Sequence, residues 1–254
     1  MSRGSVERSS FTEKGIRVMT ITSPPTHTTT PGSTRQRPAL TAGALLVGAI
    51  TFAAGDLGRR LVLPDDEVTG IPDMVRRVQA HSGAWLALGL AVVLGSVAMM
   101  PGILAVVRRR PGLADAGPDS ELESGRGGRT ILVGGALTFL GLVASVAHAL
   151  AFYGMAAIDG TSGASMAAVQ AMEDASNRYP LFVLIIIAFI AGMTLGPIVL
   201  AWGLRRAGAV PIWVPVAALV FAVTGTLSGT IAGVVGLLAA VVTFGMIART
   251  LIRG

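Results

Sequence analysis

The chain has 254 residues, of which 52% are hydrophobic and only 13% carry a charge. Soluble domains carry about 25% charged residues, so this composition excludes a disordered protein and argues against an ordinary soluble enzyme. The chain has no cysteine, which excludes disulfides, thiolate metal sites and cysteine nucleophiles. Its formal net charge is +6. The basic residues lie in short segments between apolar runs, as in membrane proteins, so we expect no nucleic-acid partner.

Residues 1–38 form a polar tail that is rich in Ser, Thr and Pro. A segment of this composition cannot bury enough apolar surface to offset the entropy lost on ordering, so we predict that it is disordered. The topology derived below places this tail in the cytoplasm.

Six apolar runs without a charged residue follow the tail, and we predict that each is a transmembrane helix. About 20 helical residues cross the ~30 Å hydrocarbon core of a bilayer. The last two runs are ambiguous, because residues 211–248 are uncharged throughout. One helix of that length would be about 57 Å long, so we predict two helices and a turn at Gly229. The six predicted helices are 39–57, 83–107, 131–156, 180–203, 211–227 and 230–248.

The distribution of basic residues indicates how these helices are oriented. With the N terminus inside, fifteen of the 20 basic residues fall on inner segments and five on outer segments, in agreement with the positive-inside rule. A five-helix alternative would place Arg249 and Arg253 outside. We therefore predict an all-α, polytopic transmembrane bundle of six helices with both termini in the cytoplasm, in the plasma membrane of a bacterium. The first run also resembles the apolar part of a signal peptide, but its removal would break this charge balance.

The segments between the runs give three further expectations. Residues 72–80 and 163–176 have the pattern of short helices, and in the second Met166, Val169 and Met172 fall on one face. We expect both to lie on the membrane surface or on the bundle, a lid or partner surface being the alternative. Residues 108–130 mix charges with glycine, which predicts a flexible connector.

Glycine pairs four positions apart predict where helices pack closely. Lipid tails are as apolar as the helices, so association in a membrane depends on small residues that let two backbones approach each other. The three pairs are Gly192 with Gly196, Gly225 with Gly229, and Gly229 with Gly233.

His148 is the only ionisable residue well inside a predicted span. Ionisable groups inside a membrane are costly and often functional, but a neutral histidine also serves as a hydrogen-bonding contact between helices. Asp56 and His81 are predicted at a similar depth, and together with His148 they would form an outer cavity that binds a cation or passes protons. The alternative for Asp56 is a local salt bridge with Arg60, four positions away.

The motifs of catalysis are absent or incomplete. Gly160-Thr161-Ser162-Gly163 matches the nucleophile string of rhomboid-type intramembrane proteases, but those enzymes need a histidine on a later helix, and none follows. The sequence has neither a zinc-protease motif nor a phosphate-binding loop. We therefore expect no catalytic residues, no metal and no cofactor.

The layout resembles a broad set of multi-pass membrane proteins of high-GC Gram-positive bacteria. The resemblance lies in a first helix that ends in an acidic residue (Gly55-Asp56-Leu57), followed by a short amphipathic segment and a His and a Trp at the start of the second helix (His81-Ser82-Gly83-Ala84-Trp85). It covers about residues 39–250 and implies six helices and no assigned activity. Members often have a His-Pro after the acidic residue, where this chain has Gly58-Arg59-Arg60.

The function that these observations favour is that of a non-enzymatic accessory or scaffold protein of the cell envelope. Its expected partners are the lipid bilayer and either another membrane protein or a second copy of the chain. The alternative is a small-solute or proton-coupled transporter that uses His148 in a cavity of the outer leaflet.

Overall fold

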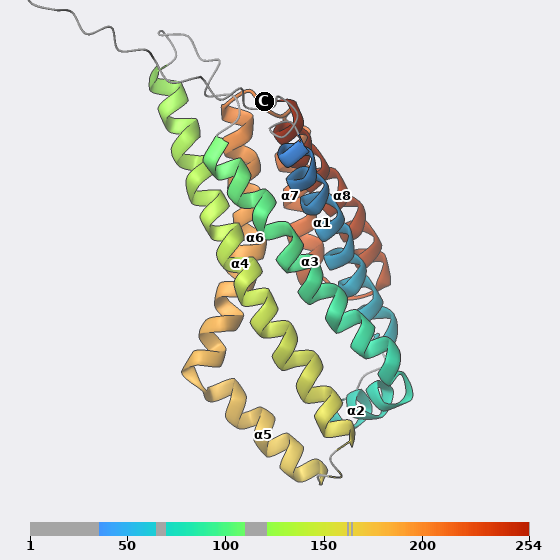
Figure 1. Ribbon diagram of the computed structural model, residues 1–254. Coiled ribbons are helices and arrows are strands. Elements are labelled where there is room, and N and C mark those ends of the chain that lie inside the picture. Colours follow the sequence, from blue (N-terminus) through green and yellow to red (C-terminus); the bar gives the residue numbers. More distant parts are fainter. Residues whose placement is uncertain (1–35, 65–69, 110–120, 162, 164, 254) are drawn as a thin grey trace, which may run out of the picture.

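The computed structural model describes residues 36–64, 70–109, 121–161, 163 and 165–253, and the predicted tail 1–38 lies outside them apart from its last three residues. The described chain is all-α, with eight helices (Figure 1). These are α1 (Gln36–Val62), α2 (Ile71–Ala80), α3 (Ser82–Arg109), α4 (Glu121–Thr161), α5 (Met166–Arg178), α6 (Pro180–Arg206), α7 (Trp213–Thr226) and α8 (Thr230–Arg253).

Five of these helices are long and apolar enough to cross a membrane, and they correspond to five of the six predicted spans. The candidate spans are Pro38–Val62, Ser82–Arg109, Gly127–Met155, Pro180–Arg206 and Thr230–Arg253. The sixth predicted span, 211–227, is the shorter apolar helix α7 of 14 residues. Its length is about 21 Å, less than the ~30 Å hydrocarbon core. The chain thus has the architecture of a multi-pass helical membrane protein, with α7 too short to count as a span by length alone.

The two predicted short helices are confirmed, whereas the predicted connector is partly wrong. Residues 72–80 lie in α2 and most of 163–176 lies in α5. The segment Glu121–Arg129, expected to be flexible, instead forms the first turns of the 41-residue α4. Glu, Leu and Arg have high helix propensity, whereas the three glycines of this segment disfavour a helix. A helix that already exists beyond residue 130 extends over them without a new nucleation step.

Six of the helices pack side by side in a closed ring, in the order α1, α3, α4, α6, α7, α8 and back to α1. The C terminus lies at one end of this ring, and α2 lies at the opposite end, where it packs on α3 and α4 (Figure 1). We call these the C-terminal end and the α2 end. The helix α5 runs beside the α2 end and turns directly into α6 at Tyr179.

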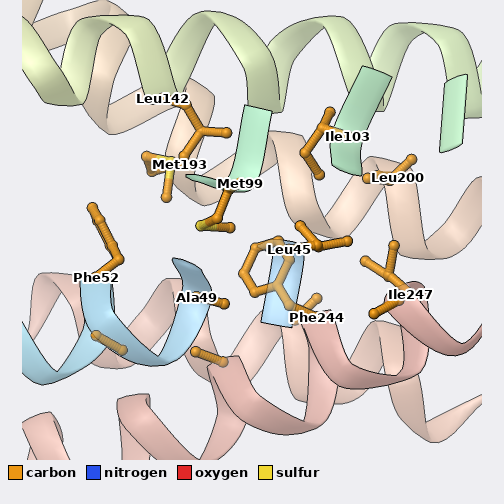
Figure 2. Close-up of a cluster of buried hydrophobic side chains, with 14 of the residues drawn as sticks. Leu45, Ala49, Phe52, Met99, Ile103, Leu142, Met193, Leu200, Phe244 and Ile247 are labelled. Atoms are coloured by element: carbon orange, nitrogen blue, oxygen red, sulfur yellow. The ribbon is translucent and has the colours of Figure 1, made fainter. Parts of the chain in front are cut away.

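The C-terminal half of the ring is filled with apolar side chains. Figure 2 shows Leu45, Met99 and Phe244 pointing toward one another from α1, α3 and α8, and all three are buried. Leu200 of α6 and Ile247 of α8 complete this part of the cluster. Dense packing of this kind leaves no room for a solute, so the interior of the ring is closed toward the C-terminal end.

The glycines predicted to bring helices together differ in what they contact. A Cβ atom added at Gly192 would overlap the backbone of Gly141, and one added at Gly196 would lie 2.5 Å from the backbone nitrogen of Thr138. These two glycines therefore let α6 approach the backbone of α4. Gly233 faces the side chains of Leu57 and Arg60 on α1.

The remaining two glycines make no such contact, which corrects the expectation for the pair Gly225 and Gly229. A Cβ atom at either position would meet nothing within 4 Å. Gly229 instead has a φ of +90° in the turn between α7 and α8, a conformation that favours glycine. The turn predicted at this residue is confirmed, and it divides the uncharged segment 211–248 into two helices.

Candidate functional site

The α2 end of the ring is hollow. Two cavities there, with volumes of about 370 and 240 Å³, share Phe52, Asp56, Phe189 and Gly225 in their walls. A third, also of about 240 Å³, lies between α2, α3 and α4 and has none of these four residues in its wall. The larger cavity is lined by α1, α6, α7 and α8, and the smaller by residues of α1, α3, α4, α6 and α7. Phe52 and Met193 line the larger cavity and also belong to the buried apolar cluster, so the cluster borders this cavity. The packed core thus closes the hollow space toward the C-terminal end.

Asp56 lines both cavities and forms salt bridges with two arginines, Arg59 and Arg60. The Nε of Arg60 donates to Oδ2 of Asp56 at 2.8 Å. The Nε and Nη2 of Arg59 donate to Oδ1 at 3.4 and 3.3 Å. Spacings of three and four residues on one helix bring these side chains together. The local salt bridge that the sequence offered as the alternative role of Asp56 is therefore present, and Arg59 adds a second one.

Arg60 is a buried cation that joins α1 to the turn between α7 and α8. Only 2% of its surface is exposed. Its Nη2 donates to the carbonyl of Thr224 at 3.1 Å, and its Nη1 donates to the carbonyls of Leu227 and Gly229, the latter at 3.4 Å. The last carbonyls of a helix have no partner within it, and a cation is favoured there. Arg60 therefore pairs with carbonyls at the end of α7 and in the turn that follows it.

His148 is held by ring stacking. Its imidazole stacks on Phe189 of α6 with ring centroids 4.9 Å apart and on Phe152 of its own helix at 5.8 Å. It lies in the wall of the smaller cavity together with Asp56 and Arg59. Its Nδ1 atom is buried and has no hydrogen-bond partner among the described residues. A polar atom of this kind is rare in a native structure unless a water, an ion or a ligand pairs with it.

His81 does not join this group, so the expected cluster of three is reduced to Asp56 and His148. His81 follows α2 as its C-terminal cap, is exposed, and its Nδ1 lies 3.0 Å from the carbonyl of Arg77. The α2 helix carries it away from the interior of the ring. Arg59, and not His81, lines the smaller cavity with Asp56 and His148.

Sequence reasoning did not identify Arg59 or Arg60 as site residues. It considered Arg60 only as the local partner of Asp56, because the carbonyls that Arg60 binds lie 164 to 169 positions further along the chain. One signal was present in the sequence. Two arginines directly after an apolar run, on the side that the positive-inside rule disfavours, need an explanation other than topology.

The chemistry available here is binding and proton exchange. An imidazole, a carboxylate and a guanidinium share one cavity, and the larger neighbouring cavity adds mainly apolar walls. Within the described ranges, no group of three or more His, Asp or Glu side chains is arranged to hold a metal ion. Comparison of the chain with known protein families, curated proteins and solved structures finds no match.

Proposed function

We propose that this chain is a carrier in the plasma membrane of a bacterium, with six spans and both termini in the cytoplasm. In this proposal it binds a small solute in the hollow α2 end, which faces outward, and His148 exchanges protons with the bound solute or with water. This is the transporter that the sequence analysis kept as its alternative. It retains the expectation of a protein that is not an enzyme.

The observation that carries the proposal is the difference between the two halves of the ring. One half encloses about 370 and 240 Å³ of space beside His148, Asp56 and Arg59. The interior of the other half is packed with buried side chains such as Leu45, Met99 and Phe244 (Figure 2). The pocket of about 630 Å³ in that half is a surface groove lined by exposed residues of α3 such as Pro101 and Leu104. A cavity that is open on one side and closed on the other is what alternating access requires of a carrier in one of its states.

The six-span topology is supported by the ring and by the charge distribution. The α7 helix takes a place in the ring between α6 and α8. Arg60 lies 22 residues beyond Pro38 on α1, or about 33 Å along the helix. Because Arg60 binds the turn between α7 and α8, that turn lies at the far end of the span of α1. The position of this turn near the far end of α1 supports α7 as a short sixth membrane crossing.

A proton-flux measurement tests the carrier function. The purified protein is placed in liposomes that contain a pH-sensitive dye, and the external buffer is made mildly acidic. We expect the wild type to acidify the interior and His148→Leu to abolish this signal. His81→Leu is the matched control, because His81 is exposed and outside both cavities, and it should behave as the wild type.

Two results would overturn the proposal. One is wild-type protein that moves protons no faster than empty liposomes, and the other is an equal loss of flux in His81→Leu. An inactive wild type that co-purifies with a second membrane protein would favour the accessory or scaffold function that the sequence analysis placed first.

A further inference from the structure

The two cavities together have the character of a site for an amphiphile. Their volumes, about 370 and 240 Å³, lie in the range of small-molecule sites. The walls of the larger cavity are mostly apolar, with Met193, Phe221 and Leu237 among them. The charged groups lie at one side of the space, on the last turns of α1. The two cavities are adjacent, with Phe52, Asp56, Phe189 and Gly225 in both walls, and a ligand that reaches past these shared residues into both needs a polar end and an apolar end.

The charge at the polar end favours an anion. Asp56 contributes one negative charge, and Arg59 and Arg60 contribute two positive charges, so one positive charge is in excess. Arg60 is buried and already donates to Asp56 and to three carbonyls. Arg59 is different, because its hydrogen bonds go to a single oxygen of Asp56 and are long, at 3.3 and 3.4 Å. Its guanidinium keeps donors free for a ligand.

His148 adds a second polar group at the same place. It shares the smaller cavity with Arg59, and its buried Nδ1 has no partner among the described residues. A turn of the imidazole ring would bring this nitrogen to a ligand oxygen in the cavity, which would supply the missing hydrogen bond with the imidazole as donor. A carboxylate has two oxygens and accepts from two donors, so one oxygen pairs with Arg59 and the other with His148.

The wall formed by α6 and α7 gives an apolar chain a route from the bilayer. Ile190 lines the larger cavity although half of its surface is exposed. Gly225 and Thr226, at the end of α7, also line this cavity and are exposed. The cavity therefore reaches the outside of the bundle between these two helices, where lipid surrounds a membrane protein.

We propose that the site binds a monoanionic, single-chain amphiphile of the fatty-acid type, with its carboxylate on Arg59 and His148 and its alkyl chain in the larger cavity. One excess positive charge matches one carboxylate, and a cavity at the lower end of the small-molecule range suits one chain better than two. The inference deepens the proposed carrier function and rests on it for the assignment of this space as a binding site.

Binding of radiolabelled dodecanoate tests the inference directly. The full-length protein is placed in nanodiscs of phosphatidylcholine, and empty nanodiscs give the background due to partition into lipid. We expect saturable binding that unlabelled dodecanoate displaces and that dodecyltrimethylammonium, with the same chain and the opposite charge, does not. Hexanoate should compete poorly, because its chain leaves the larger cavity largely empty.

Variants locate the site. We expect Arg59→Gln to weaken dodecanoate binding about tenfold, since a hydrogen bond to a charged group is lost. Ala232→Phe, which adds a ring to the wall of the larger cavity, should also weaken it. Arg76→Gln is the matched control, because Arg76 lies on α2 outside both cavities, is exposed and pairs with Asp73. It should leave binding unchanged.

The results that would overturn the inference are distinct from those that would overturn the carrier function. Unchanged binding in Arg59→Gln, equal displacement by dodecyltrimethylammonium, or no binding above empty nanodiscs contradicts the fatty-acid site even if proton flux depends on His148. Binding that depends on Arg59, in a protein that moves no protons, supports the site and contradicts only the carrier function.

Discussion

At the scale of single residues, Arg60 is the side chain whose surroundings explain most about the α2 end. A buried charge is stable only when it is paired and its hydrogen-bonding groups are satisfied. Arg60 meets this condition with Asp56 on its own helix and with the carbonyls of Thr224, Leu227 and Gly229. The same contacts give a donor to the carbonyl of Thr224 in the last turn of α7 and to two carbonyls of the turn that follows.

Replacement of Arg60 by methionine should be strongly destabilising. The variant leaves the carbonyls of Thr224 and Leu227 without the donor they have in the wild type, and Asp56 with only its weaker partner. We therefore expect a loss of about 3 kcal/mol in the free energy of unfolding. Unfolding of the detergent-solubilised protein by SDS measures this loss. Arg59→Met is the matched control. Its side chain is 25% exposed and bonds only to Asp56, so its cost should stay below about 1 kcal/mol. Equal costs would contradict the role assigned to Arg60.

At the scale of helices, sequence periodicity and length predicted most of the elements, and the errors have physical causes. Apolar runs locate the five long helices, since a lipid-exposed helix needs apolar residues all around it. The extension of α4 back to Glu121 was missed, because the boundary was drawn where charge begins, whereas an existing helix extends past charged residues without a new nucleation step. The length of α7 was overestimated, since the helix covers Trp213–Thr226 within the predicted 211–227. The length of an apolar run does not show where a residue of another helix, here Arg60, binds the carbonyls at a helix end.

The contact between α4 and α6 shows what composition alone cannot decide about glycines. Gly192 and Gly225 both belong to pairs four residues apart, but only Gly192 lies against another backbone, that of Gly141. Which face of a helix meets a neighbour depends on the packing of the whole ring. The spacing of small residues identifies candidates for close approach, and only the arrangement of helices selects among them.

Alanine substitutions separate these two glycines. Gly192→Ala places a methyl group on the backbone of α4, so the helices must move apart, and we expect a loss of about 1–3 kcal/mol. Gly225→Ala has open space around it and should fall within about 1 kcal/mol of the wild type, on the stabilising side. SDS unfolding measures both. If Gly225→Ala proved the more harmful of the two, the assignment of the contact between α4 and α6 to Gly192 would fail.

The turn between α7 and α8 offers a second comparison at this scale. Gly229 has a φ of +90°, where a side chain is strained, so Gly229→Ala should cost about 1–2 kcal/mol. The neighbouring Ser228 is exposed, and Ser228→Ala should change stability by less than about 0.5 kcal/mol. A thermal unfolding curve of each variant in detergent measures the difference. If the unfolding curves of Gly229→Ala and Ser228→Ala coincided, the positive φ at residue 229 would not require glycine, and the prediction would be wrong.

At the scale of the whole molecule, the sequence predicted a helical bundle but not its hollow end. Depth along the helices placed Asp56 and His148 near one level, and both do line one cavity. The sequence did not predict that Arg59 lines the same cavity or that Phe189 stacks on His148. Convergence of side chains from different helices depends on the order of helices around the ring, which hydropathy does not encode.

The proposal that the cavity faces outward depends on the orientation of the whole molecule in the membrane. Cysteine labelling tests this orientation, since the chain has no native cysteine. In intact cells, an impermeant thiol reagent should label Ser165→Cys, before α5, and Ser228→Cys, in the turn between α7 and α8. It should reach Ser120→Cys, before α4 in the sequence, and Arg253→Cys, at the end of α8, only after the membrane is permeabilised. The reverse pattern would make the cavity face the cytoplasm. Labelling of Ser165→Cys but not of Ser228→Cys would mean that α7 and α8 form a hairpin whose turn stays within the membrane, because a turn at the outer surface is open to the reagent.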